Sequence, residues 1–432
     1  MSWLHNLFID EAKPALDRHS GGSNDGELDP IMAEQAELIE ELSATLDEKV
    51  AAYDVGYDAA LEKLTDLVVT ENGEYTPPGD STGFKSVSVD IPSEVNALID
   101  RSIAGSISSS VTSVGQYAFD NCTGLTSVNF PNATSMGQYA FRGCTSLVDI
   151  NFPEVLAVGH CSFNGCKALQ SVSFLKATSI AYGAFESCAA LQSVNFPNVT
   201  SCDQRAFSYC GKLSNISLPS ATSIGEMAFN QCDDLQSVDF PNVTSISSSA
   251  FDRCTILKRI SSPNLTTIGR QAFYCCYKLT GIDLQSVTSI GESAFGGCWE
   301  LPNVNAPNVT SIGSSAFSSC PKLTSADFQK ITSIASGTFS SCSSLKAVIL
   351  RSETLCKLSS TGAFNGCYRI LGTYDYTYNK NSDKDGYFYV PRALVEDYKV
   401  ATNWSTYASQ FRALEDYTVD GTITGELDPT KI

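Results

Sequence analysis

A repeat with a period of 22 residues is the feature of this 432-residue sequence that most limits its fold. Each unit contains a Phe with a Cys three residues later, as in SSAFSSC at residues 314–320. The repeated Phe occupies positions 119, 141, 163, 185, 207, 229, 251, 273, 295, 317 and 339, and Phe364 follows after 25 residues. A period kept over twelve units excludes a series of separate globular domains and predicts a solenoid of stacked coils.

The pattern inside one unit predicts a short strand followed by a turn. In the first unit we expect Val128 and Phe130 to point into the coil, and Ser127 and Asn129 to face solvent, because side chains alternate along a strand. Pro131 then ends the strand, since it has no amide hydrogen for a ladder. We expect the segment around each Phe to form a short helical or 3₁₀ turn.

The pattern AFxxCxxLxxVxFPNxTSIG resembles the BspA-like, Treponema-type leucine-rich repeat over residues 104–371. The resemblance implies an α/β-type leucine-rich-repeat solenoid of parallel strands, with 22-residue coils and about twelve repeats. Such repeats are common in bacterial surface proteins and also occur in phage virion proteins. The resemblance is specific for the fold and says little about function, because one fold hosts many functions.

The chain contains 16 cysteines, of which 12 follow the repeated Phe. The others are Cys161, Cys202, Cys275 and Cys356. A disulfide framework needs an oxidising compartment, and a metal site needs Cys-x₂-Cys pairs or nearby His, whereas the three His are scattered. We therefore favour buried thiols that pack as small apolar side chains and donate weakly to backbone carbonyls. No metal and no cofactor is expected.

Residues 28–68 carry an apolar stripe with coiled-coil spacing and one stutter. The stripe consists of Ile39, Leu42, Leu46, Val50, Tyr53, Tyr57, Leu64 and Leu67. It predicts a long α-helix that pairs with copies of itself, with a homotrimer favoured over a dimer by analogy with viral fibres. The alternative is a helix that packs back on the repeat array.

Residues 1–27 combine a short amphipathic peptide with a Gly/Ser/Asn/Asp linker. Its candidate anchoring residues are Trp3, Leu4, Leu7 and Phe8, and the arrangement resembles the peptide that attaches a fibre to a larger particle. A frayed terminus that covers the end of the coiled coil is the alternative. Residues 69–103 predict a small β connector, with two strands around a Pro-Gly turn.

The last segment, residues 372–432, is rich in aromatic side chains. It is similar to the cap that closes such arrays, and the open core of a terminal coil requires one. We expect two short helices within residues 391–414. The competing interpretation is an exposed aromatic surface for stacking on sugars.

The net charge of −19 is concentrated in residues 1–100, which carry −17. This distribution disfavours binding to nucleic acid, which needs a basic patch, and to anionic membranes. We find no signal peptide and no apolar run long enough to insert in a membrane. We expect a protein made in a host cytoplasm and located on the virion surface, held by its N-terminus to another virion protein.

The outward positions of the predicted strands form the candidate ligand face. The residues that we assign to it are Asn129, Asp149, Asn151, Asn195, Asn215, Asp239, Arg259, Asp283, Asn303, Asn305 and Asp327. The scattered His and isolated carboxylates offer no base beside a reactive partner, so we do not expect an enzyme. Two carboxylates brought together by the fold, as in a polysaccharide-cleaving fibre, stay the alternative.

These features lead to two hypotheses of function. The first is a non-enzymatic phage fibre or decoration protein that binds a host-surface receptor, a glycan or a protein, with a glycan favoured. The second is a bacterial BspA-like adhesin. The predicted order of anchor, coiled coil and solenoid favours the first.

Overall fold

The computed structural model describes residues 87–88, 94–95, 104–108, 110–372, 374–375, 380–381, 384–419 and 422–423. The chain divides into two units, Met1–Pro77 and Pro78–Ile432, and all described residues belong to the second. The predicted anchoring peptide and coiled coil lie outside the described residues. This concerns the predictions for Trp3, Leu4, Leu7, Phe8, Ile39, Leu42, Leu46, Val50, Tyr53, Tyr57, Leu64 and Leu67.

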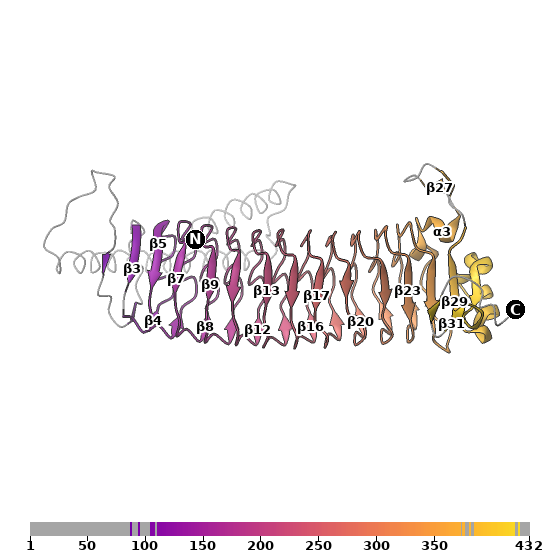
Figure 1. Ribbon diagram of the computed structural model, residues 1–432, viewed down its shortest axis with the longest axis horizontal. Coiled ribbons are helices and arrows are strands. Elements are labelled where there is room, and N and C mark those ends of the chain that lie inside the picture. Colours follow the sequence, from indigo (N-terminus) through magenta and orange to yellow (C-terminus); the bar gives the residue numbers. More distant parts are fainter. Residues whose placement is uncertain are drawn as a thin grey trace, which may run out of the picture. The chain divides into compact units, whose positions relative to one another are not determined.

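The second unit is a solenoid whose coils stack through two ladders of parallel strands (Figure 1). Among the described residues, the first ladder is divided into four sheets and the second into two. We name each coil by its repeated Phe. Partners in both ladders are one coil apart: Ser223 pairs with Ser245 and Ile224 with Ile246. This 22-residue register confirms the predicted leucine-rich-repeat solenoid.

The first ladder, called here the long-strand face, runs from the start of the solenoid to its C-terminal end. Its strands are β1 (Val87–Ser88), β3 (Ala104–Ser108), β5 (Gly124–Asn129), β7 (Asp149–Asn151), β9 (Ser171–Ser173), β11 (Ser193–Asn195), β13 (Asn215–Ser217), β15 (Ser237–Asp239), β17 (Arg259–Ser261), β19 (Gly281–Ile282), β21 (Asn303–Asn305), β23 (Ser325–Phe328), β25 (Ala347–Leu350), β29 (Tyr387–Val390) and β30 (Phe411–Ala413). Because β1 pairs in parallel with β3, the ladder begins inside the segment predicted as a connector.

The second ladder, called here the short-strand face, is built from the TSI segments. Its two-residue strands are β2 (Glu94–Val95), β4 (Ser113–Val114), β6 (Ser135–Met136), β8 (Ala157–Val158), β10 (Ser179–Ile180), β12 (Ser201–Cys202), β14 (Ser223–Ile224), β16 (Ser245–Ile246), β18 (Thr267–Ile268), β20 (Ser289–Ile290), β22 (Ser311–Ile312), β24 (Ser333–Ile334) and β26 (Lys357–Leu358). In the coils from β4 to β26 the second residue of each strand is buried and lines the core.

The core is a set of columns in which each residue type stacks on its own copy in the next coil. The repeated Phe rings form one column, with Phe119 and Phe141 stacked at a centroid distance of 4.9 Å and Phe295 and Phe317 at 5.2 Å. Aromatic rings prefer offset stacking at such distances. Because the sequence repeats with a constant period, equivalent side chains pack on one another continuously along the solenoid axis.

The turn around the repeated Phe differs from the predicted helical or 3₁₀ turn. In the Phe119 coil, the amide of Ala118 donates to Gly115 within the coil, whereas the amide of Phe119 donates to Ala140 in the next coil at 2.7 Å. A helix would close both bonds within its own segment. Instead Tyr117 and Asn121 adopt φ of 58° and 59°. The prediction is wrong for these coils, and only the last has a 3₁₀ turn, η1 (Thr361–Phe364).

The repeated Cys side chains join successive coils. The Cys144 thiol donates to the carbonyl oxygen of Phe119 at 3.0 Å, and the same oxygen accepts the amide hydrogen of Cys122 at 3.2 Å. The bond recurs up to Cys367, whose thiol donates to Phe339 at 3.0 Å. None of the 16 cysteines, all of which the structure describes, forms a disulfide, and all but Cys275 are buried. The structure confirms the packing interpretation of the thiols.

The C-terminal segment covers the last coil with short helices. These are η2 (Arg392–Leu394), α4 (Val395–Val400), η3 (Trp404–Gln410) and η4 (Leu414–Asp416), and a four-residue helix α3 (Tyr368–Leu371) precedes them. The indole nitrogen of Trp404 donates to the Cys356 carbonyl at 2.7 Å, and the Tyr398 hydroxyl accepts the Cys356 amide at 2.9 Å. Trp404 and Tyr398 thus bond to backbone groups of the last coil, as a further coil would.

Two antiparallel pairs complete the described structure. β27 (Tyr374–Asp375) pairs with β28 (Lys380–Asn381), and β31 (Thr418–Val419) pairs with β32 (Thr422–Ile423). None of the helices among the described residues is long and apolar enough to cross a membrane.

Candidate ligand-binding face

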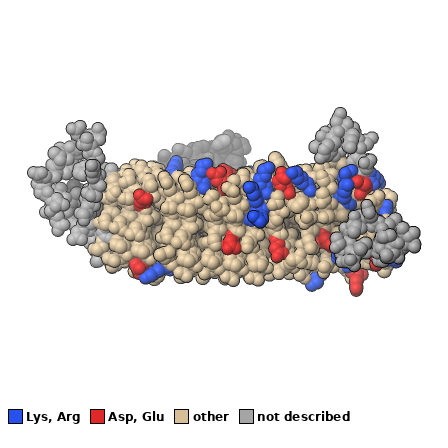
Figure 2. Space-filling view, in the orientation of Figure 1, with Lys and Arg blue, Asp and Glu red and all other residues tan. Residues whose placement is uncertain are grey.

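The structure places the predicted ligand residues along the long-strand face. Ten have exposed side chains: Asn129, Asp149, Asn151, Asn195, Asn215, Asp239, Arg259, Asp283, Asn303 and Asn305. They extend from the Phe119 coil to the Phe295 coil and thus form a strip rather than one compact site. Figure 2 shows single acidic side chains spaced along this face, with Lys and Arg gathered mainly at one edge.

Neighbouring polar side chains on the strip bond to one another. Asn151 donates to the Asn129 side-chain oxygen at 2.7 Å, and Ser237 donates to that of Asn215 at 2.8 Å. Asn195 likewise donates to the Ser173 hydroxyl at 3.2 Å. A surface of this kind can exchange water for the hydroxyl groups of a ligand without exposing apolar area.

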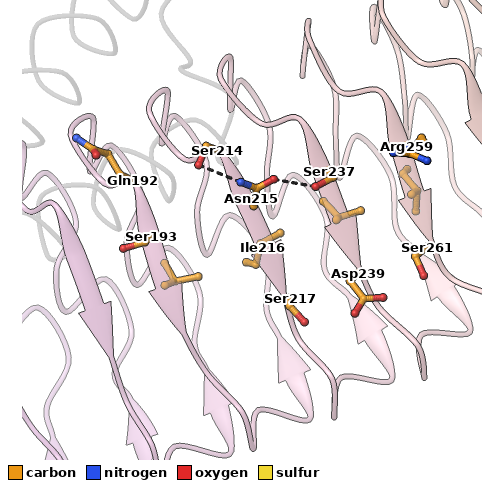
Figure 3. A pocket seen from close by; sticks show the side chains of 13 residues that line it. Gln192, Ser193, Ser214, Asn215, Ile216, Ser217, Ser237, Asp239, Arg259 and Ser261 are labelled. Atoms are coloured by element: carbon orange, nitrogen blue, oxygen red, sulfur yellow. Dashed lines mark hydrogen bonds between the residues drawn. The ribbon is translucent and has the colours of Figure 1, made fainter.

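Four coils form a shallow pocket of about 700 Å³ in the middle of the strip (Figure 3). It brings together three of the predicted residues, Asn215, Asp239 and Arg259. The other lining residues are Gln192, Ser193, Val194, Ser214, Ile216, Ser217, Ser237, Val238, Ile260 and Ser261. Gln192 and Ser214 were missed by the sequence analysis because they precede the strands, where the alternation rule gives no direction.

The two charged residues of the pocket stand apart from each other. Arg259 is in register with Ser237, whereas Asp239 is in register with Ser261, at the other end of the strands. Within the described part of the chain neither side chain takes part in an ion pair. The pocket therefore offers a cation, a carboxylate and several amides and hydroxyls to a bound molecule.

The family comparison agrees with this geometry. The family described as "BspA type Leucine rich repeat region (6 copies)" matches residues 101–213, 158–280 and 266–389, which is more than half of the chain. The protein belongs to this family. Its solenoid is thus a BspA-type leucine-rich-repeat solenoid.

Several solved structures resemble the BspA-type chain. A leucine-rich repeat protein from Bacteroides ovatus is 25% identical, with a TM-score of 0.44 over 70% of this chain and 87% of that one. A leucine rich cell surface protein from Faecalibacterium prausnitzii is 25% identical, with a TM-score of 0.37 over 65% and 86%. The pneumococcal vaccine antigen PcpA is 18% identical, with a TM-score of 0.45 over 77% and 94%. No curated protein matches the chain.

Asp327 has a different environment from the other predicted ligand residues of the BspA-type face. Its carboxylate is half-buried and forms a two-bond ion pair with Arg351, at 2.8 Å to Nε and 2.7 Å to Nη2. This hydrogen bond raises the pKa of the Arg351 guanidinium. The negative charge of Asp327 is therefore paired with Arg351. The alternation of side chains along the strand could not predict this partner, which lies 24 residues away.

The acidic side chains of the strip are separated from one another. Asp239 and Asp283 lie two coils apart, which corresponds to about 10 Å at the usual spacing of parallel strands. Across the described coils and cap, no group of three or more His, Cys, Asp and Glu side chains could hold a metal ion. The arrangement suits binding, as is typical of leucine-rich-repeat scaffolds.

Proposed function

We propose that this BspA-type protein is a non-enzymatic fibre or decoration protein of a phage virion, anchored by its N-terminus, that binds a host-surface glycan. The pocket across β11, β13, β15 and β17 is the observation that carries the binding role. Strands β13, β15 and β17 belong to one parallel sheet and β11 to the sheet before it, so paired backbone supports the pocket. Rigid positioning lowers the entropic cost of binding.

The chemistry of the pocket favours a glycan over a protein. Sugar hydroxyls act both as donors and as acceptors, and Asn215, Asp239 and Arg259 offer partners for both roles. Protein hot spots concentrate in Trp, Tyr and Arg, whereas among the lining residues only Arg259 is of these types. Repetition of similar side chains from coil to coil also suits a polymer.

The sequence pattern supports presentation on a particle. A peptide with Trp3, Leu4, Leu7 and Phe8 would attach to another virion protein, and the helix of residues 28–68 would associate as a homotrimer. Three solenoids held together would raise the avidity of individually weak glycan contacts. Light scattering on the full chain tests the association, and a monomer would contradict it.

The second candidate is a bacterial cell-surface adhesin, which the BspA-type family membership favours. Mass spectrometry separates the two proposals. The virion role predicts this chain in purified phage particles from a lysate. Detection in the bacterial cell envelope alone would support the adhesin instead.

Binding itself is tested with two substitutions in the pocket. The variant Asn215→Ala/Asp239→Ala should lose at least tenfold in affinity for host-envelope polysaccharide, since it removes an amide and a carboxylate from the pocket. The matched control, Ser223→Ala/Ser289→Ala, changes exposed residues of the short-strand face and should bind like the wild type. Equal loss in both variants, or no binding by the wild type, would contradict the proposed function.

A further inference from the structure

A stacked aromatic pair, in which Trp299 is exposed and Tyr277 is partly buried, lies on the coils that follow the pocket. Trp299 is 49% exposed, and its ring stacks on Tyr277 of the preceding coil at a centroid distance of 4.1 Å. Trp404 is only 1% exposed, so Trp299 is the one exposed tryptophan in the described part of the chain. A large aromatic ring left open to solvent on a polar surface is a usual place for ligand contact.

Three cations lie on the neighbouring Phe251 coil. Arg253, Lys258 and Arg259 are exposed, and none of them belongs to an ion pair within the described residues. The next lysines behave differently, since Lys278 and Lys322 both pair with Glu300. Three of the described cations that form no ion pair therefore lie on one coil, next to the Phe273 coil that carries Tyr277.

Two observations place Arg259 and Arg253 close to the Phe273 coil. A Cβ atom on Gly281 would lie 4.0 Å from Cγ of Arg259, so the Arg259 side chain extends over the coil that carries Tyr277. The hydrogen bond with Cys275 raises the pKa of the Tyr277 phenol, and the charge of Arg253 acts in the opposite direction. Gly281 also leaves the strip without a side chain next to Arg259, which opens space there.

We propose that Trp299, Tyr277 and Arg259 form a subsite for an acidic glycan, in which a uronate ring lies against Trp299 and its carboxylate pairs with Arg259. The inference rests on the proposed function and extends the pocket, because Arg259 also lines it. Pairing of guanidinium with carboxylate in two parallel hydrogen bonds gives orientation as well as energy. Arg253 and Lys258 add positive potential for further acidic units.

The surroundings of the patch argue against two other ligand classes. A protein interface needs a contiguous apolar centre, whereas the other large exposed apolar side chains (Leu156, Leu175, Tyr209, Leu355 and Val400) lie on other coils or in the cap. Single-stranded nucleic acid needs a continuous basic track. Here Asp239, Asp283 and Glu300 interrupt any such track.

Tryptophan fluorescence of the full chain tests the proposal. With Trp3→Phe as the background, emission comes from Trp299 and from the buried Trp404. Titration with alginate, a polyuronate, should shift the emission of Trp299 in a saturable and salt-sensitive way. Dextran, a neutral polymer, and a single-stranded oligonucleotide should bind at least tenfold more weakly.

Substitutions then separate the subsite from the pocket. Isothermal titration calorimetry measures alginate binding of the variants, since it does not depend on the emission of Trp299. Trp299→Ala and Arg259→Gln should each weaken alginate binding about tenfold or more, and Trp299→Phe should recover part of the loss. Tyr209→Ala, which removes another exposed ring on the Phe207 coil, is the control and should bind normally. Unchanged far-UV circular dichroism of each variant verifies that it folds.

The outcomes separate a failure of the acidic-glycan subsite from a failure of the proposed function. Equal binding of dextran and alginate, tighter binding of the oligonucleotide, or normal alginate binding by Trp299→Ala would overturn the acidic-glycan subsite. If Asn215→Ala/Asp239→Ala still weakened binding to envelope polysaccharide in that case, the proposed function would stand. Absence of binding to any polysaccharide by the wild type would overturn both.

Discussion

At the residue scale, the corner beside the repeated Phe depends on left-handed backbone at two positions in every coil from Phe119 to Phe339. In the Phe317 coil these are Ser315 and Ser319, each with φ of 56°. The AF spacing could not predict this conformation, because the same spacing fits one helical turn. The amide hydrogen bonds that fix this turn run to carbonyl oxygens of the next coil. The residue spacing within one coil therefore contains no sign of them.

Substitution of Ser319 by Gly should stabilise the solenoid. Left-handed backbone costs a non-Gly residue about 1–2 kcal/mol, which exceeds the entropy cost of about 0.5–1 kcal/mol for adding Gly. Gly297 already occupies the same position one coil earlier, with φ of 76°. We expect a gain of up to about 1 kcal/mol, measured by urea denaturation.

Ser318→Gly provides the matched control, because Ser318 is not among the residues of positive φ. It should lower the free energy of unfolding by about 0.5–1 kcal/mol. A loss of stability in Ser319→Gly of the same size as in Ser318→Gly would show that left-handed strain does not govern this corner.

At the element scale, the C-terminal helices act as a substitute for a further coil. The sequence predicted a cap here and left an exposed aromatic surface for sugars as the alternative. Tyr398, Trp404, Tyr407 and Phe411 are buried against the last coil, so these four rings are unavailable for stacking on sugars. Their polar atoms meet the backbone of residues 356–361, which no sequence spacing could indicate.

Trp404→Ala should open the C-terminal end of the solenoid. It removes a buried ring, at a cost of about 3–5 kcal/mol, and the Cys356 carbonyl loses its indole donor. Since each coil contacts only its neighbours, hydrogen exchange should accelerate from about residue 345 onward and stay unchanged around the Phe141 coil. The control is Val400→Ala, at a residue that is 80% exposed. Uniform acceleration along the solenoid would contradict a local cap.

At the scale of the whole molecule, the buried thiols make stability depend on alkaline pH. Burial raises the pKa of repeated thiols such as Cys188, Cys232 and Cys254 well above the ordinary value, and that of Cys161 to about 11. The unfolded chain releases these protons near pH 8.5 while the folded chain retains them. Stability is therefore complete below about pH 8.5 and falls as the pH rises from there toward the folded pKa values.

The size of this loss is large because many thiols contribute. At pH 9.5 each thiol that stays protonated in the fold costs about 1.4 kcal/mol, so a dozen cost roughly 17 kcal/mol. We expect circular dichroism to show cooperative loss of structure between about pH 9 and 10.5, reversible under reducing conditions. Unchanged urea midpoints at pH 7.5 and pH 10 would contradict the account of the thiol column.

The architecture of the repeat region could be predicted from sequence because one period specifies every coil. The binding surface could be predicted only in part. Alternation placed Asn215, Asp239 and Arg259 on one face, but it did not show that four particular coils form the pocket. It also left Trp299 and Tyr277 unassigned, because they precede the strand and become neighbours only through stacking.

The central claim is that ligand contacts the long-strand face and leaves the short-strand face free. Hydroxyl-radical footprinting of the full chain with host-envelope polysaccharide tests this directly. We predict protection of peptides that contain residues 192–195, 214–217, 237–239 and 259–261, and of Trp299, with unchanged labelling at residues 223–224, 245–246 and 267–268. Protection of the short-strand residues with free labelling of the long-strand face would contradict the account.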